Sequence, residues 1–191
     1  SFALGHVYSN NIVGGFVYLE EGMLKIKRVF KALLDYQITG MPSTPTMLEL
    51  LMSKYKERFL SLANKMEYMV VNSAPLPSLL ATEIIKEFPQ LNLHVYYGLT
   101  EASRSTFITL SNESSDLYES VGPASPRVEI KIENEEVCIK GPHLFSGYWK
   151  QPEETNKSIR KGWFHTGDLG SLNLNGYLTI TGRIKDLINV G

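Results

Sequence analysis

Between Tyr36 and Tyr97 the sequence alternates short apolar runs with amphipathic runs, and this alternation limits the possible folds more than any other feature. A strand, a helix and a second strand in this order need a right-handed crossover, which makes the strands parallel in one sheet. The pattern therefore predicts an α/β fold. The expected strands are 36–41, 67–71 and 92–97, and the expected helices are 45–55 and 77–88.

The helix that begins at Pro45 has the clearest start signal. Proline suits the first helical position because no backbone N–H is needed there, and Ser43 or Thr44 can cap the helix. A further helix is expected over 24–34, where the apolar residues share one face. Residues 1–22 are apolar and aromatic, but their spacing does not decide between a buried helix and a strand.

Ligands of parallel sheets bind beyond the carboxyl ends of the strands, and residues 73–75 and 98–101 fall at that edge. Gly98 lets the backbone turn close to a ligand. The Thr100 hydroxyl can donate to a phosphate oxygen, and the Glu101 carboxylate can bind Mg²⁺. The same two residues would also fit a helix N-terminus, with threonine as the cap and glutamate in the first turn. The residues alone leave both interpretations open.

From Ser120 onward the pattern becomes that of antiparallel strands. Two alternating segments, 127–132 and 135–140, flank a turn and predict a small antiparallel sheet or part of a barrel. The preceding stretch, 102–120, is polar and is expected to be a loop. The whole sequence therefore predicts an α/β subdomain over 1–120 and a β-rich subdomain over 121–191.

A hairpin is expected near the end of the chain. Asn173 to Gly176 is a strong turn signal, and the alternating run after it reads as the returning strand. This hairpin would bring Asp168 and Arg183 to one pocket. A carboxylate there suits a sugar diol, and the arginine can donate to hydroxyl or phosphate oxygens. A surface hairpin whose aspartate caps its own turn is the alternative.

Some features are expected to be structural. Cys138 lies in an alternating strand and reads as a small core residue, and the aromatic side chains of 147–149 are expected to contribute by packing. His94, His143 and His165 show no ligand spacing with a second histidine, cysteine or aspartate, so the sequence predicts no transition-metal site.

Composition limits the class of protein. The formal net charge is −1, which argues against a nucleic-acid partner or an anionic membrane surface. The single cysteine excludes an internal disulfide and fits a reducing compartment, so we expect a cytoplasmic protein. No run reaches the roughly eighteen apolar residues of a membrane helix, so we expect no membrane span. The opening Ser1–Ala3 has neither an initiator methionine nor a basic signal region, and we expect a fragment of a longer chain. The sequence shows no feature that sets an oligomeric state.

Several motifs together resemble the adenylate-forming superfamily, most closely its acyl-CoA synthetases and other acid–thiol ligases. The resemblance is strongest over 66–191 and extends to the whole chain. It implies part of the large domain of such an enzyme, an α/β subdomain followed by a small antiparallel β subdomain. The motifs are Tyr97-Gly98-x-Thr100-Glu101, Trp163-Phe164-x-Thr166-Gly167-Asp168 and Gly182-Arg183-x-Lys185-Asp186-x-Ile188-x-x-Gly191.

The resemblance also implies roles for individual residues. Asp168 and Arg183 would hold the ribose of ATP, and Lys185 would lie at a hinge. Near the phosphates, Thr100 would contact an oxygen and Glu101 would bind Mg²⁺. The adenine would stack near Tyr97 and Gly98, beside the small-residue loop formed by Ser73, Ala74 and Pro75. His6 is the candidate for a histidine between the substrate carboxylate and the thiol tunnel, although Ser9 stands where the family has glycine.

The implied reaction joins a small-molecule carboxylic acid to a thiol, as in fatty acid metabolism. ATP activates the acid as an acyl-adenylate, and coenzyme A or another thiol takes the acyl group. No Ser/Thr/Gly-rich loop ending in Pro-Lys is present, and the chain stops at the hinge, so the chain alone is expected to be inactive. An amino-acid adenylation domain fragment and a non-catalytic nucleotide-binding or interaction module are the alternatives.

Overall fold

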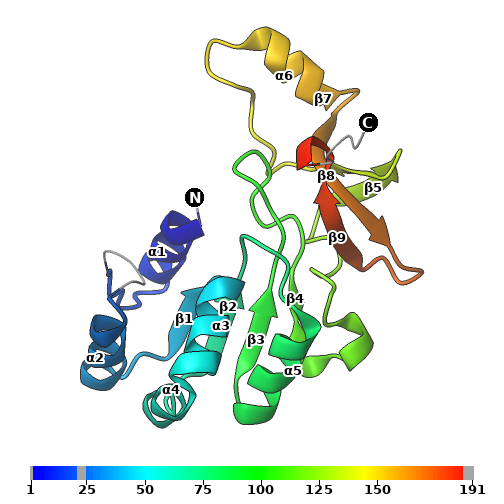
Figure 1. The fold of residues 1–191 in the computed structure, drawn as a ribbon. Helices are drawn as coiled ribbons and strands as arrows, with labels where there is room; N and C mark the ends of the chain where they lie inside the picture. Colours follow the sequence, from blue (N-terminus) through cyan, green and yellow to red (C-terminus); the bar gives the residue numbers. More distant parts are fainter. Residues whose placement is uncertain (1, 21–24, 187–191) are drawn as a thin grey trace. The chain divides into compact units, whose positions relative to one another are not determined.

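The computed structural model describes residues 2–20 and 25–186 (Figure 1). The chain divides into two compact units. The first unit contains Ser1–Val95 and Thr109–Tyr118, and the second contains Tyr96–Ile108 and Glu119–Gly191. The parallel sheet belongs mainly to the first unit, and the antiparallel sheet belongs to the second.

The first unit is built on the predicted parallel sheet. Strand β1 pairs in parallel with β2, and β2 pairs in parallel with β3, so that Met41, Met69 and Leu93 lie in one row across the sheet. The short β4 completes the order β1-β2-β3-β4. The strands are β1 (Gly40–Ser43), β2 (Tyr68–Val71), β3 (Asn92–Val95) and β4 (Ile108–Thr109).

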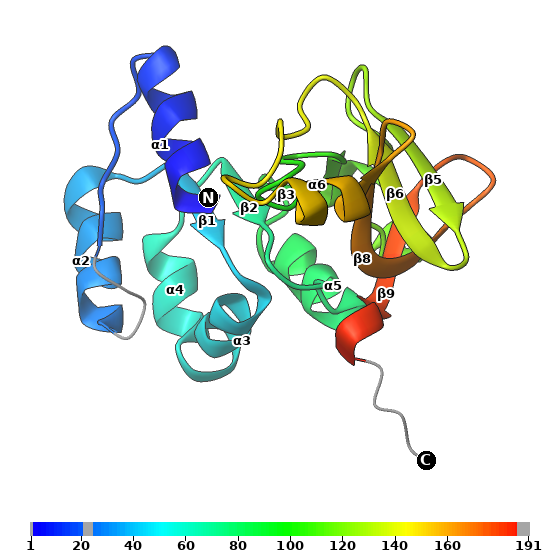
Figure 2. The same ribbon diagram turned by 90° about the horizontal axis from the view of Figure 1, so that it is seen from above.

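Helices cover one face of this sheet. In Figures 1 and 2, α3, α4 and α5 all lie on the same side of β1, β2 and β3, as right-handed crossovers require. The core between helices and sheet is apolar, and Leu48, Leu51, Met69, Ile84 and Leu93 are fully buried in it. The helices of this unit are α1 (Phe2–Ile12), α2 (Ile26–Tyr36), α3 (Pro45–Lys54), α4 (Lys56–Leu62) and α5 (Ser78–Glu87).

The start of α3 matches the prediction, but the boundary between α2 and β1 does not. Helix α3 begins as expected, and Thr44 rather than Ser43 caps it, because the Thr44 hydroxyl accepts from the Met47 N–H at 3.4 Å. The strand expected over 36–41 was placed too early. Helix α2 continues to Tyr36 and ends at Gln37, whose φ of 48° closes the helix before the strand can start.

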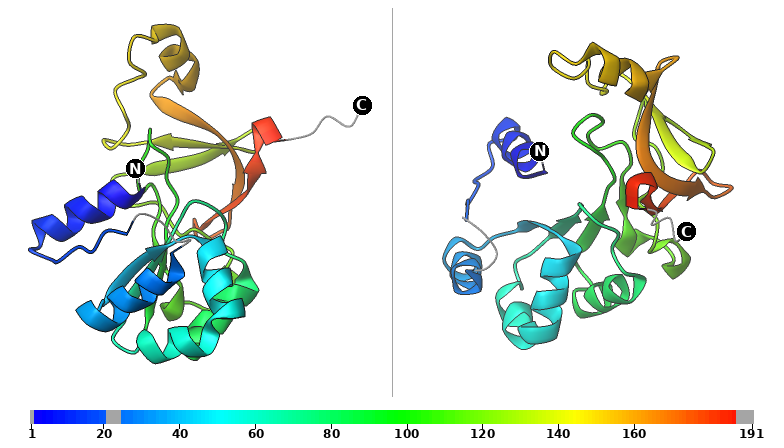
Figure 3. Two further views of the ribbon diagram at one scale, coloured as in Figure 1. Left: turned by 60° about the vertical axis from the view of Figure 1, so that its left-hand side comes forward. Right: turned by 45° about the horizontal axis from the view of Figure 1, so that its top comes forward.

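The second unit contains a five-stranded sheet in which all pairings are antiparallel. The predicted fold class, a parallel-sheet α/β part followed by an antiparallel β part, is therefore confirmed (Figure 3). Helix α6 precedes the short β7, and η3 follows the last strand. The elements are β5 (Glu129–Glu133), β6 (Glu136–Lys140), α6 (Pro152–Ser158), β7 (Ile159–Arg160), β8 (Trp163–Leu172), β9 (Leu178–Arg183) and η3 (Ile184–Asp186).

The predicted hairpin is the pair β8–β9. Its turn is held by the Asn173 side chain, which accepts from the N–H groups of Asn175 and Tyr177 at 2.9 and 3.0 Å. Gly176 closes the turn with a φ of 79°, which glycine adopts without a steric penalty. The turn predicted from the sequence therefore sets the register between β8 and β9.

Two predictions outside the hairpin are corrected. The stretch 102–120 is more than a polar loop, since it contains β4 and the short 3₁₀ turns η1 (Leu110–Asn112) and η2 (Ser115–Leu117), and Leu110 is fully buried. Trp149 does not pack as expected, because 84% of it is exposed. None of the helices in the described ranges has the length and hydrophobicity that a membrane crossing requires.

Candidate functional site

Asp168 and Arg183 are brought together by the register of the hairpin. They are direct partners across β8 and β9, and the Arg183 Nε–H donates to Asp168 Oδ1 at 2.6 Å. Gly167 precedes the aspartate with a φ of 73°, and the register shifts just after it, between Leu169 and Gly170. A β-bulge of this kind bends the strand, and such bulges are common beside binding sites.

The second oxygen of the same carboxylate is also paired. The Tyr97 hydroxyl donates to Asp168 Oδ2 at 2.7 Å, although the two residues are 71 positions apart. Tyr97 follows β3, and its backbone N–H donates to the Thr106 hydroxyl, which fixes the start of its loop. The three residues form a constellation that we call the carboxylate cluster: Tyr97, Asp168 and Arg183.

Burial of Asp168 strengthens the hydrogen bonds within the carboxylate cluster. Asp168 is only 5% exposed, whereas 57% of the Arg183 side chain is exposed. Burial raises the pKa of the Tyr97 phenol, and the neighbouring carboxylate adds to the rise, so the phenol keeps its proton and remains a donor. The same carboxylate raises the pKa of Arg183. The interpretation of Asp168 as a surface residue capping its own turn is wrong, because it is buried within a strand.

The loop that follows Tyr97 does not begin a helix. Leu99 and Ala102 exchange backbone hydrogen bonds at 3.1 and 3.2 Å, and the chain turns back on itself there. A Cβ at Gly98 would lie 2.4 Å from the Arg104 backbone nitrogen, so only glycine fits this turn. Thr100 is exposed at the loop surface. The helix-cap interpretation of Thr100 and Glu101 is therefore wrong.

Glu101 is held by a neighbouring loop. The Tyr148 hydroxyl donates to Glu101 Oε1 at 2.9 Å, and the Phe145 N–H donates to the Glu101 backbone oxygen at 2.8 Å. The rings of Phe145 and Tyr148 pack edge to face, with centroids 4.8 Å apart. A half-buried carboxylate oriented in this way suits a hard cation such as Mg²⁺. Sequence reasoning treated Tyr148 only as a packing residue, and the Gly-Tyr-Trp motif was its only signal.

The other predicted site residues lie in different places. Lys185 is exposed in η3, directly after the strand that carries Arg183. Ser73, Ala74 and Pro75 form an exposed turn after β2 in the first unit, with a φ of 84° at Ser73. His6 is half-buried in α1. Their predicted roles in a nucleotide or substrate site stay predictions.

Comparison with known proteins identifies the family. The sequence model described as AMP-binding enzyme matches residues 1–149. The chain belongs to the AMP-binding enzyme family. Asp168 and Arg183 lie beyond the matched residues, but alignments with individual relatives cover more of the chain. The acyl-CoA ligase sidI of Aspergillus fumigatus is 31% identical over 177 residues, which is 84% of this chain.

A further relative and a solved structure are similar to most of this chain. Long chain acyl-CoA synthetase 5 of Arabidopsis thaliana is 30% identical over 86% of this chain. Among solved structures, the o-succinylbenzoate coenzyme A synthetase of Bacillus subtilis in complex with ATP and magnesium ion superposes with a TM-score of 0.83 at 25% identity, covering 98% of this chain and 40% of that one. The chain spans only 30% and 27% of the length of the two curated relatives.

Proposed function

We propose that this chain is part of an ATP-dependent ligase that joins a carboxylic acid to coenzyme A, and that its second unit binds the nucleotide. The single observation that carries the proposal is the carboxylate cluster. A buried carboxylate with two aligned oxygens accepts from both hydroxyls of a ribose diol, as it now accepts from Tyr97 and Arg183. Arg183, more than half exposed, turns its remaining N–H groups to ribose or phosphate oxygens.

In this proposal the phosphates of ATP lie along the loop that follows Tyr97. The exposed Thr100 hydroxyl donates to a phosphate oxygen, and Glu101 is the protein ligand of Mg²⁺. Bound Mg²⁺ supplies charge neutralisation to the phosphates. Tyr148 orients the Glu101 carboxylate, and Gly98 allows the tight turn that presents both side chains. The adenine stacks near Tyr97 and Gly98, beside this turn.

The reaction has two steps. A carboxylate oxygen of the substrate attacks the α-phosphorus of ATP, and the bond to pyrophosphate breaks to give an acyl-adenylate. The sulfur of coenzyme A then attacks the acyl carbon, and AMP leaves. Phosphoryl chemistry of this kind depends on positioning and charge stabilisation, which fixed donors and carboxylates provide. The names of the relatives, acyl-CoA ligase and acyl-CoA synthetase, favour coenzyme A as the acceptor.

The complete reaction needs more than this chain. Since the chain spans about a third of the length of its relatives, we expect it to hold nucleotide without catalysing adenylation. Purified chain mixed with ATP, Mg²⁺ and radioactive pyrophosphate should show no exchange of label into ATP. Measurable exchange would contradict this expectation.

The ribose assignment is tested by binding of AMP to the chain in a calorimeter. AMP needs neither Mg²⁺ nor the acid substrate, so the measurement isolates the carboxylate cluster. Asp168→Ala should weaken binding by about tenfold or more, because a charge-assisted hydrogen bond contributes about 1.5–3 kcal/mol. Asp186→Ala removes an exposed carboxylate from η3 and is the matched control. Equal affinity of the wild type and Asp168→Ala would overturn the assignment.

A further inference from the structure

A second group of polar side chains gathers on the antiparallel sheet. Glu133 of β5, Cys138 of β6 and His165 of β8 each offer one ligand atom, and these atoms all lie within 4.8 Å of one another. Cys138 and His165 are direct partners across the two strands, and Sγ lies 3.5 Å from Nδ1. We call these three residues the thiol cluster.

Glu136 supports the thiol cluster from the same strand as Cys138. One of its oxygens lies 2.9 Å from His165 Nδ1, and the other accepts from the Gly167 N–H at 2.8 Å. The imidazole and this carboxylate therefore fix each other's orientation. Metal binding at Nδ1 replaces this hydrogen bond and leaves the Glu136 carboxylate as a further oxygen beside the ion.

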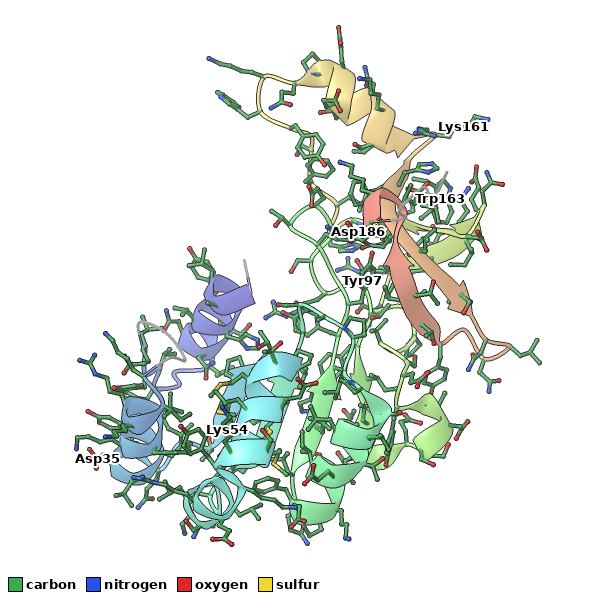
Figure 4. All side chains as sticks on the ribbon, viewed as in Figure 1. Asp35, Lys54, Tyr97, Lys161, Trp163 and Asp186 are labelled. Carbon is green, nitrogen blue, oxygen red and sulfur yellow. The ribbon has the colours of Figure 1, made fainter. Side chains whose placement is uncertain are left out.

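Burial is graded across the thiol cluster. Cys138 is fully buried, the His165 side chain is 10% exposed, and the Glu133 side chain is 47% exposed. The Glu133 carboxylate is therefore the solvent-exposed edge of the thiol cluster. Trp163 of β8, labelled in Figure 4, has the Lys131 ammonium 4.8 Å from its ring centre.

The chemistry of these atoms selects a particular class of ion. Thiolate and imidazole favour zinc and similar borderline divalent metals over Mg²⁺ or Ca²⁺. Ligand atoms around tetrahedral zinc are about 3.3–3.8 Å apart, given metal bonds of about 2.0–2.3 Å. The observed 3.5 Å between Sγ and Nδ1 falls in that range.

We propose that Cys138, His165 and Glu133 form a binding site for a zinc-class divalent metal, which joins β5, β6 and β8. The proposal goes beyond the ligase function and does not depend on it. It also departs from the expectation drawn from sequence spacing, because cross-strand pairing brings together side chains that the sequence separates.

The thiol proton has a defined fate in this assignment. Metal binding breaks the S–H bond of Cys138, forms the metal–sulfur bond and releases the proton to solvent. His165 presents the Nδ1 lone pair to the metal in place of its contact with Glu136. Lys131, which pairs with Glu133, releases that carboxylate to the metal.

Cobalt(II) is the probe that tests the site most sharply. The chain has one cysteine, so a thiolate-to-cobalt charge-transfer band can come only from Cys138. Titration of the folded chain with Co²⁺ should produce this band together with the visible bands of tetrahedral cobalt, and added Zn²⁺ should abolish both. Absence of the charge-transfer band at saturating Co²⁺ would overturn the proposal.

Variants identify the remaining ligands. Zn²⁺ affinity measured by competition should fall about tenfold or more in Glu133→Gln and in His165→Asn, by analogy with losses around known metal sites. Glu133 is exposed, so its replacement leaves the fold intact. Glu135→Gln and His143→Gln are matched controls from the same unit and should bind Zn²⁺ as the wild type does. Unchanged affinity in both ligand variants would show that the ion binds elsewhere and would overturn the assignment.

Discussion

The Asp168 carboxylate shows what sequence can and cannot establish about a single residue. Its pairing with Arg183 was predictable, because a strong turn signal fixes the register of a hairpin and the register fixes the partners. Its hydrogen bond to the Tyr97 hydroxyl was not, because no local pattern connects residues 71 positions apart. For the same reason the sequence did not predict Tyr148 as the partner of Glu101. Nor could the spacing of cysteine and histidine in the sequence predict the thiol cluster.

The Tyr97 hydroxyl should matter for stability as well as for binding. Tyr97→Phe leaves the buried carboxylate with one fewer donor, so the free energy of unfolding should fall by about 1.5–3 kcal/mol. Urea unfolding followed by circular dichroism measures this change. Tyr177→Phe is a matched control that leaves the carboxylate cluster intact. A loss of equal size in both variants would mean that the bond to Asp168 contributes nothing specific.

At the scale of elements, the sequence predicted the elements that have explicit start and stop signals. Helix α3 has a proline and a threonine cap at its start, and the β8–β9 hairpin has an asparagine-glycine turn. Errors occurred where tertiary packing decides. Helix α4 was not predicted, and its only fully buried side chain is Phe59, so its apolar face is too narrow for a clear periodicity.

The hairpin turn offers a clean test of the register argument. Gly176 has a φ of 79° and open space where a Cβ would stand, so Gly176→Ala introduces backbone strain without a clash. Unfolding free energy should fall by about 1–2 kcal/mol. Gly182→Ala, in β9, also meets open space but lacks the positive φ, and it should be close to neutral. Thermal denaturation measures both variants. Equal decreases in their melting midpoints would contradict the prediction.

At the scale of the whole molecule, acid should destabilise the fold through a half-buried histidine. His143 Nε2 lies 2.9 Å from the Ser105 hydroxyl, which itself donates to the Ala102 oxygen, so the imidazole is the donor. Its Nδ1 is buried without a hydrogen-bond partner among residues 2–20 and 25–186. Burial lowers the pKa of His143 below its ordinary value, because a protonated ring would bury an unmatched N–H.

The sign of the pH effect follows from this shift. Below about pH 6.5 the unfolded chain binds the proton before the folded chain does, so the unfolding free energy falls as the pH drops toward the folded pKa. The urea midpoint should therefore be lower at pH 5.5 than at pH 7.5. His143→Gln keeps a side-chain donor for Ser105 and should reduce the difference between the two midpoints. An unchanged difference would exclude His143 as the titrating group.

The central claim is that the Asp168 carboxylate binds the ribose diol, and one thermodynamic cycle tests it most directly. AMP and 2′,3′-dideoxy-AMP are titrated into the wild-type chain and into Asp168→Asn. Loss of the hydroxyls should weaken binding to the wild type by at least about tenfold, but by less than about threefold in the variant, since the charged acceptor is already gone. Equal weakening in both proteins would contradict the account, because the diol would then be bound by other residues.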